Sequence, residues 1–210
     1  MITIDIETTG LMPSPTPEML NLMPSPPATA DNIVAIGCLD EFGINIFSAP
    51  FDTYKISLDE AEKICLKNFG DYLIHADDNL LLSYNGIFFD IPFITTKLMM
   101  HGGDFFNNVS SILLDTYVRH LDLMEYAKFA SGRRLAKDDA CRKLANLYVP
   151  RKSEGLWNAR IYKNPQLLSE NDHLEMLQHN ATDLTATTRM YNIVKHFPDF
   201  AEWRLKEAQP

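Results

Sequence analysis

The chain has few cysteines, no long apolar run and no excess of positive charge. Its three cysteines, Cys38, Cys65 and Cys141, are scattered and form no Cys-x-x-Cys pair, which argues against disulfides and a structural zinc site. No uninterrupted apolar stretch approaches the ~20 residues of a membrane-spanning helix. The N-terminus lacks the basic and apolar regions of a signal peptide. We therefore expect a soluble protein of a reducing, cytoplasmic compartment with no membrane partner.

The formal net charge is −9. Proteins that coat nucleic acid bind phosphates through Lys and Arg, so this acidic balance argues against simple coating. It is compatible with an enzyme that holds one strand end through metal ions. The basic residues are nevertheless clustered, and they form either solvated faces or a strip that follows a phosphate backbone: Arg133, Arg134, Lys137, Arg142, Lys143, Arg151 and Lys152.

The 210 residues, 46% of them apolar, suffice for one domain with a substantial core. β-Branched residues predict a strand at 2–6, and the segments 32–41 and 43–50 read as a hairpin. The first three strands are therefore expected to be adjacent and antiparallel. Residues 11–31 are rich in Pro and Ser, repeat LMPSP, and predict a long loop inserted after the first strand.

Helical signals dominate the rest of the chain. Ser57 and Glu60 fit a capping box that opens a helix reaching Ala76. An apolar run at 79–84 predicts a strand covered on both faces, and a helix is expected from Asp90 to His101. Further helices are predicted near 135–147 and 171–197. The sum is an α/β fold whose central mixed sheet is flanked by helices.

Two acids end the first strand, in DIETTG (5–10). Asp5 and Glu7 are two residues apart, so they share one face of the strand. Neighbouring carboxylates repel each other and are costly to bury. They mark either a solvated strand edge or a site that holds a positive ion.

A third acid follows the buried strand, in YNGIFFDIPF (84–93). Asp90 lies at the start of the predicted helix, so it is either the helix N-cap or a functional carboxylate. Its neighbours are strongly apolar, which is unusual for a solvated cap. In open α/β sheets, ligand sites lie at the carboxyl ends of strands, where both Glu7 and Asp90 are expected.

A histidine and a fourth acid occur in HNATDLTAT (179–187). His179 and Asp183 are four residues apart and lie on one face of the predicted helix, about one turn from each other. Apolar residues on both sides indicate a buried helix. The pair is either an ordinary hydrogen bond within the helix or part of a site.

The three motifs together favour a metal centre. Four acids on buried elements can gather only if cations neutralise them, and Mg²⁺ or Mn²⁺ prefers carboxylate oxygens. Two such ions, ~4 Å apart, can stabilise the attacking and leaving oxygens of a phosphodiester. His179 is then placed to deprotonate the attacking water.

These motifs resemble those of the DEDD superfamily of 3′–5′ exonucleases, which have a ribonuclease H-like fold. The resemblance spans about residues 2–195. The second motif and RHLDLMEY (119–126) are most similar to proteins related to the proofreading exonuclease domain of B-family DNA polymerases. HNATDL also resembles a bacterial branch often called ribonuclease H-like. The resemblance implies metal ligands at Asp5, Glu7, Asp90 and Asp183, and a general base at His179.

The third motif departs from the pattern of the family. The branch that uses Tyr places it four residues before the Asp, and the branch that uses His usually has one more residue between. Here the residue is His at the Tyr spacing, so His179 is either the base or an orienting group. By resemblance, Thr8, Gly10 and Leu11 would line the pocket for the 3′-terminal nucleotide. Asn85 and Phe89 are further candidates, Phe89 by stacking on a base.

The resemblance implies a two-metal 3′–5′ exonuclease that releases nucleoside 5′-monophosphates from a single-stranded or frayed DNA 3′ end. The resemblance also implies DNA repair or proofreading as the setting, while a polymerase or repair partner is not readable from the sequence. One alternative is a ribonuclease acting on RNA or an RNA–DNA hybrid. The other is a nucleic-acid-binding or scaffold module without catalysis, against which the complete set of acids argues.

Overall fold

A five-stranded mixed sheet forms the centre of the protein. The structure is a computed structural model, and it describes residues 1–9, 32–76, 80–117, 120–149 and 169–207. The strands follow the order β3-β2-β1-β4-β5 across the sheet. Their bounds are Ile2–Thr8 (β1), Ile33–Leu39 (β2), Ile44–Ser48 (β3), Leu81–Ser83 (β4) and Leu121–Asp122 (β5). β1, β2 and β3 are antiparallel neighbours, whereas β4 and β5 run parallel to β1.

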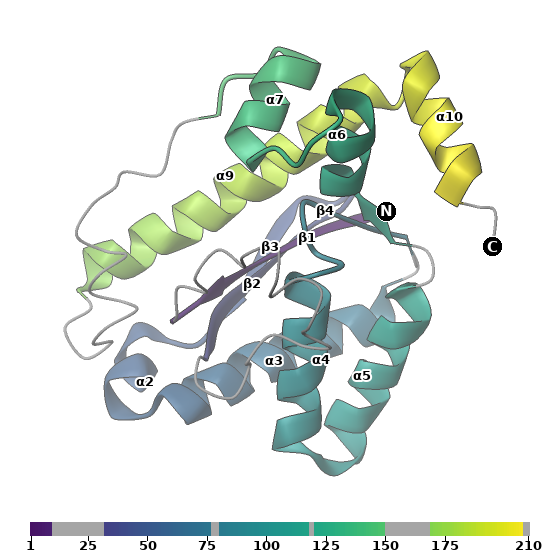
Figure 1. Cartoon of the computed structure of the whole chain (residues 1–210). Helices are drawn as coiled ribbons and strands as arrows, with labels where there is room; N and C mark the ends of the chain where they lie inside the picture. The colour runs from purple at the N-terminus through teal and green to yellow at the C-terminus, as the bar shows by residue number, and fades with distance from the viewer. Residues whose placement is uncertain (10–31, 77–79, 118–119, 150–168, 208–210) are drawn as a thin grey trace.

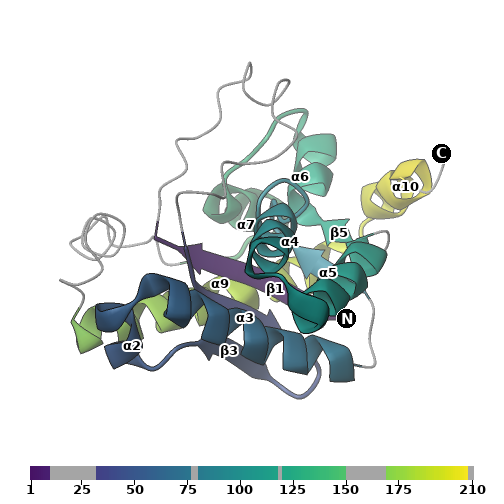
Figure 2. The ribbon, with the colours of Figure 1, turned by 90° about the horizontal axis from the view of Figure 1, so that it is seen from below.

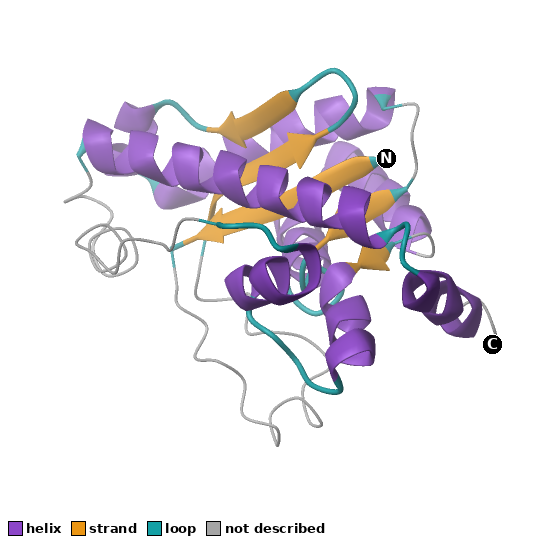
Figure 3. Ribbon diagram, turned by 90° about the horizontal axis from the view of Figure 1, so that it is seen from above, coloured by secondary structure: helices purple, strands orange, loops and turns teal. Residues whose placement is uncertain are grey.

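Helices cover both faces of the sheet. α9 crosses one face, while α3, α4 and α5 pack on the other side, as Figures 1 and 2 show. Seen from the α9 side, α7, α6 and α10 lie next to α9 (Figure 3). The bounds are Phe51–Ile56 (α2), Leu58–His75 (α3), Asp90–His101 (α4), Gly103–Tyr117 (α5), Leu123–Ser131 (α6), Lys137–Ala145 (α7), Glu170–Val194 (α9) and Pro198–Glu207 (α10).

The alternation of β1 assigns its side chains to the two faces. Ile2, Ile4 and Ile6 are buried among the side chains of α3 and α4, as the period of two in a strand requires. The odd-numbered residues face α9, where the hydroxyl oxygens of Thr3 and Thr188 lie 2.6 Å apart. Asp5 and Glu7 therefore point to the α9 face, the side on which the third motif lies.

The predicted elements agree with the structure in most places. The hairpin of β2 and β3, the buried β4, and the helix from Asp90 to His101 are all confirmed. Ser57 is the N-cap of α3 and accepts a hydrogen bond from the Glu60 amide at 3.2 Å. The other half of the predicted capping box is absent, because the Ser57 amide donates to the Thr53 carbonyl instead. That bond closes α2, a short helix that the sequence analysis did not predict.

Several differences have physical causes. β5 has only two residues, too few for a periodic pattern, and it was not expected. The helix of the third motif was expected to be buried, but on α9 Leu174 is 48% exposed, whereas Asn180 is fully buried. The Pro-rich loop prediction at 11–31 lies outside the described residues. Within the described part of the chain, no helix is both long and apolar enough to cross a membrane.

Candidate active site

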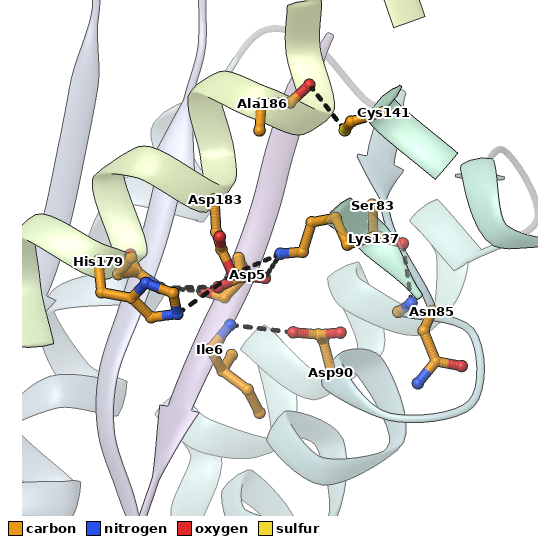
Figure 4. Close-up of polar contacts among 12 residues, drawn as sticks. Asp5, Ile6, Ser83, Asn85, Asp90, Lys137, Cys141, His179, Asp183 and Ala186 are labelled. Atoms are coloured by element: carbon orange, nitrogen blue, oxygen red, sulfur yellow. Dashed lines mark hydrogen bonds and ion pairs between the residues drawn. The ribbon is translucent and has the colours of Figure 1, made fainter. Parts of the chain in front are cut away.

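Three of the predicted acids meet near the middle of β1. Asp5 projects from β1 and Asp183 from α9, and Asp90 comes from the first residue of α4 (Figure 4). The Lys137 ammonium, at the start of α7, donates to Asp5 Oδ1 at 2.9 Å and to Asp183 Oδ2 at 2.7 Å. The side chains of Asp183 and Lys137 are only 15% and 18% exposed. The site is thus a partly buried cluster of carboxylates around one cation.

The position of Asp90 depends on the shortness of β4, which has only three residues. β4 pairs with β1 only at Ile2 and Thr3, so the backbone of β1 needs another partner further along the strand. The Asp90 side chain provides this partner, because the Ile6 amide donates a hydrogen bond to Asp90 Oδ1 at 2.9 Å. Asp90 is not the helix N-cap, a position that Phe89 occupies.

The electrostatics of Asp90 favour a cation. Burial raises the pKa of its carboxyl well above the usual value, and the nearby charge of Asp5 raises it further, while Lys137 and the Ile6 amide oppose the shift. The pKa of Lys137 is raised, because the charges of Asp5 and Asp183 outweigh the opposing effect of burial. The cluster therefore has more negative charge than one ammonium neutralises.

The position of His179 agrees with a role beside the acids. Its Nε2 lies 3.6 Å from Asp183 Oδ2, beyond hydrogen-bonding distance, and its side chain is 18% exposed. The contact is an ion pair between residues four apart on α9, which fits both an ordinary pair within the helix and a part of the site. Glu7 lies two residues beyond Asp5 on the same face of β1 and is 5% exposed.

The described part of the chain includes three of the remaining predicted residues, Thr8, Asn85 and Phe89. Thr8 is buried at the end of β1. Asn85 is half-buried with a φ of +74°, and Phe89 is half-buried against Phe93, with ring centroids 5.7 Å apart. Gly10, Leu11 and the basic residues Arg151 and Lys152 lie outside the described residues.

Lys137 is the site residue that the sequence analysis missed. It was counted among the clustered basic residues, which form either solvated faces or a strip along a phosphate backbone, because spacing along the chain gave no sign that its amine would reach acids 132 and 46 residues away.

Asn180 and Gly37 also act on the site. The Asn180 amide group donates to Asp5 Oδ2 at 3.0 Å, so it orients that carboxylate. Gly37 is paired with Asp5 across β1 and β2. A Cβ on Gly37 would lie 1.9 Å from Asn180 Oδ1 and 2.7 Å from a methyl carbon of Leu184. Glycine at this position lets α9 approach the sheet closely enough to place Asn180 and Asp183.

The Gly37→Ala variant is expected to lose stability and activity together. The added methyl group must displace α9, which we expect to cost about 2 kcal/mol of unfolding free energy and to move Asp183 away from Asp5. Urea unfolding and turnover measure the two effects. Adding Asn180→Ala to this variant removes the closest clash, so stability should recover in part while activity stays low. Normal activity in Gly37→Ala would contradict this role for the glycine.

A buried aspartate fixes the turn that leads to Asp90. Asp122 accepts hydrogen bonds from the amides of Asn85 at 2.8 Å and Ile87 at 3.1 Å, and it also caps α6 through the Met124 amide. Burial raises the pKa of its carboxyl despite these bonds. Asp122 therefore has a positioning role for the turn between β4 and α4.

His120 and Ser83 also stabilise this turn. The Gly86 amide donates to Ser83 Oγ at 3.0 Å, which leaves the Ser83 hydroxyl proton for His120 Nε2, at 2.7 Å. A neutral imidazole can accept that proton at Nε2. Burial lowers the pKa of His120 to about 4, in agreement with a neutral ring at pH 7.

We expect acid to destabilise the protein through His120. Between pH 6.5 and about 4, the unfolded chain binds a proton that the folded protein does not, so stability falls as pH falls, by about 1.4 kcal/mol per unit at most. The measurement is urea unfolding of wild type and His120→Gln at pH 7, 6 and 5. The difference between their unfolding free energies should shrink toward pH 5. The exposed His196→Gln variant is the control, and a wild-type slope in His120→Gln would contradict the assignment.

A second acidic group lies on the other face of the sheet. Single ligand atoms of Asp59, Glu62 and His101 lie within 4.8 Å of one another, a compactness that Asp5, Asp90 and Asp183 do not reach among the described residues. Glu62 is 1% exposed and accepts a hydrogen bond from the Ile33 amide at 2.7 Å. It also contacts Lys97 at 3.3 Å and His101 at 3.1 Å. These partners use the lone pairs of Glu62, so we interpret this group as a link between β2, α3 and α4.

The acids of the first cluster fit a divalent cation by their chemistry. Their donors are hard carboxylate oxygens, as Mg²⁺ and Mn²⁺ prefer, and the pKa of Asp90 is raised first by burial and then by the nearby charge of Asp5, which a cation would offset. They are less compact because Lys137 lies between Asp5 and Asp183. A divalent cation that binds both carboxylates would have to displace the Lys137 ammonium.

The sheet begins with three antiparallel strands and continues with parallel ones, and the acids lie where β1 and β4 cease to pair. This arrangement defines a ribonuclease H-like α/β domain. The family model described as RNase_H superfamily matches residues 27–195. This match covers most of the chain, and the chain therefore belongs to the RNase_H superfamily. Membership supports a nuclease in general and leaves its substrate open.

A solved structure has the same fold. The chain is similar to the family B DNA polymerase from the hyperthermophilic archaeon Pyrobaculum calidifontis, with a TM-score of 0.61 over 92% of this chain and 15% sequence identity. It covers 24% of the polymerase chain, so the likeness concerns the fold of one part of that enzyme. No curated protein matches the chain.

Proposed function

We propose that the protein is a metal-dependent 3′–5′ exonuclease that hydrolyses the terminal phosphodiester of single-stranded or frayed DNA and releases nucleoside 5′-monophosphates. The observation that carries the proposal is the convergence of three distant motifs on one site. Asp5 and Asp183 share Lys137 as a partner, and Asp90 is bonded to the residue after Asp5. Membership of the RNase_H superfamily supports the nuclease class.

The metal ligands in this proposal are Asp5, Glu7, Asp90 and Asp183. The bound ions would lower the pKa of the attacking water and stabilise the attacking and leaving oxygens of the phosphodiester. His179 accepts the proton of that water at a ring nitrogen, and Asp183 keeps the imidazole oriented. Lys137, once released from Asp5 and Asp183, neutralises charge on the substrate phosphate.

The test uses DNA and RNA oligonucleotides of one sequence, labelled at the 5′ or the 3′ end, with Mg²⁺, Mn²⁺ or chelator. A 3′–5′ exonuclease shortens the 5′-labelled DNA in single steps and releases 5′-mononucleotides only when metal is present. A faster reaction on RNA would favour the ribonuclease alternative. Degradation that chelator leaves unchanged would refute the metal mechanism.

His179 is tested separately, because its spacing to Asp183 is that of the Tyr branch. We expect His179→Ala to lower turnover by about 100-fold, within the range of general base catalysis, and to leave metal-dependent stabilisation in place. Thermal denaturation with Mn²⁺ and single-turnover kinetics make the comparison. Near wild-type turnover would reduce His179 to an orienting group.

A further inference from the structure

An exposed aromatic residue, Phe88, precedes the site residue Asp90 by two positions. Phe88 is 45% exposed, whereas Phe89, the aromatic residue that the sequence analysis selected, is half-buried against Phe93. The guanidinium carbon of Arg134 lies 5.2 Å from the centre of the Phe88 ring. Phe88 is therefore better placed than Phe89 to meet a ligand from solvent.

The backbone on both sides of this pair is fixed. Asp122 binds the amides of Asn85 and Ile87, and the Phe88 amide donates to the Asn85 carbonyl at 3.2 Å. The Tyr84 hydroxyl donates to the Leu135 carbonyl at 2.7 Å, which ties the segment of Arg134 to the end of β4. The ring and the guanidinium are thus presented by two segments that are bonded to each other.

Each of these segments continues directly into the acid cluster. Asp90 follows Phe88 by two residues, so their Cα atoms are at most ~7 Å apart. Lys137 follows Arg134 by three residues, within ~11 Å on the same basis. Phe88 and Arg134 are therefore within about two nucleotide lengths of the acids, near enough to contact a strand whose 3′ end lies at the acids.

Arg134 is available to a ligand. Its described ion pair is with Glu125, at 3.8 Å, and both side chains are partly exposed. A long pair of this kind contributes little to stability. In a chain with a net charge of −9, Arg133 and Arg134 provide local positive charge beside the site, as binding of a phosphate backbone requires.

From this arrangement we propose that Phe88 and Arg134 form a stacking platform for the nucleotide adjacent to the terminal one in a single-stranded polynucleotide. The base stacks on the Phe88 ring, and Arg134 contacts the phosphate that follows it. This inference rests on the proposed function, which places the 3′ end of the strand at the acids. The platform contacts the next nucleotide, which a polynucleotide has and a mononucleotide ester lacks.

Binding is measured first, without hydrolysis. The double variant Asp5→Asn/Asp183→Asn serves as the background, because it should bind DNA without cleaving it. Fluorescence anisotropy measures its binding of a fluorescent single-stranded oligonucleotide of eight nucleotides. Phe88→Ala should weaken binding about tenfold, and Phe88→Trp should restore it, since stacking tolerates any aromatic ring. Arg134→Ala should lower the slope of log K against log salt by about 0.7, the value for one phosphate contact in a single strand.

Catalysis then separates the platform from the acids. In the otherwise wild-type enzyme, Phe88→Ala should raise KM for the oligonucleotide about tenfold and change kcat little. Cleavage of thymidine 5′-(p-nitrophenyl phosphate), which has no second nucleotide, should be unchanged. Phe42→Ala, on the exposed turn between β2 and β3, and Arg204→Ala, on α10, are the matched controls.

The outcomes separate this inference from the proposed function. Oligonucleotide binding that depends on Phe88 in a protein without nuclease activity would support the platform and overturn the exonuclease. Cleavage with equal KM in Phe88→Ala and Phe42→Ala would overturn the platform and leave the exonuclease intact. Absence of oligonucleotide binding would overturn the platform as well.

Discussion

Asp5→Asn and Asp183→Asn should each lower metal-dependent hydrolysis of single-stranded DNA by at least about 1,000-fold, equivalent to about 4 kcal/mol of transition-state stabilisation. Asparagine keeps the shape of each side chain but removes the charge that a divalent cation needs. Because the two carboxylates act on the same ions, the double variant should be hardly slower than either single variant. Single-turnover rates at saturating enzyme measure the loss.

The control for this result is Asp115→Asn, an exposed change on α5, which should retain wild-type turnover. Circular dichroism and thermal denaturation establish that the site variants are folded. Residual activity above one tenth of wild type in either site variant would contradict the assignment of these acids. A rate that falls equally in Asp115→Asn would point to an effect on the whole fold.

Lys137→Met should destabilise the metal-free protein by about 3 kcal/mol. Methionine preserves the length of the side chain, but Asp5 and Asp183 lose the ammonium that lies 2.9 and 2.7 Å from them. The partly buried carboxylates are then left with uncompensated charge. Urea unfolding in the presence of chelator measures this loss.

The same substitution should strengthen the response to metal. In the wild type, a divalent cation competes with the Lys137 ammonium for Asp5 and Asp183, whereas in Lys137→Met it binds without a competitor. Mn²⁺ should therefore raise the melting temperature of the variant more than that of the wild type. Lys128→Met, which removes an exposed pair with Glu125, should change neither quantity. An equal Mn²⁺ response in wild type and Lys137→Met would refute the competition.

The fold was predictable where local patterns are strong. Three elements follow from local rules: β1 from its alternating isoleucines, β2 and β3 from a hairpin pattern, and the start of α4 from a Pro in its first turn. The short β5 and α2 have too few residues for a pattern. Their formation depends on neighbours that are distant in the sequence, such as the parallel pairing of β5 with β4.

The site was predictable in its acids but not in its supporting residues. Asp5, Asp90 and Asp183 stand out because charged residues are rare within apolar segments. Lys137, Asn180 and Gly37 have no such contrast with their surroundings. Their roles arise from the crossing of α9 over the sheet and from the position of α7 beside it, which no spacing along the chain expresses. Phe88 and Phe89 illustrate the same limit, since two adjacent aromatics differ only in which one the turn leaves exposed.

The bond between the Ile6 amide and Asp90 makes one backbone proton a reporter of the whole site. The amide belongs to the central strand, one residue from Asp5, and its acceptor is a carboxylate whose charge depends on any cation nearby. The chemical shift of that single proton therefore follows the electrostatic state of the acids. A spectroscopist can read occupancy of the site from the core of the sheet.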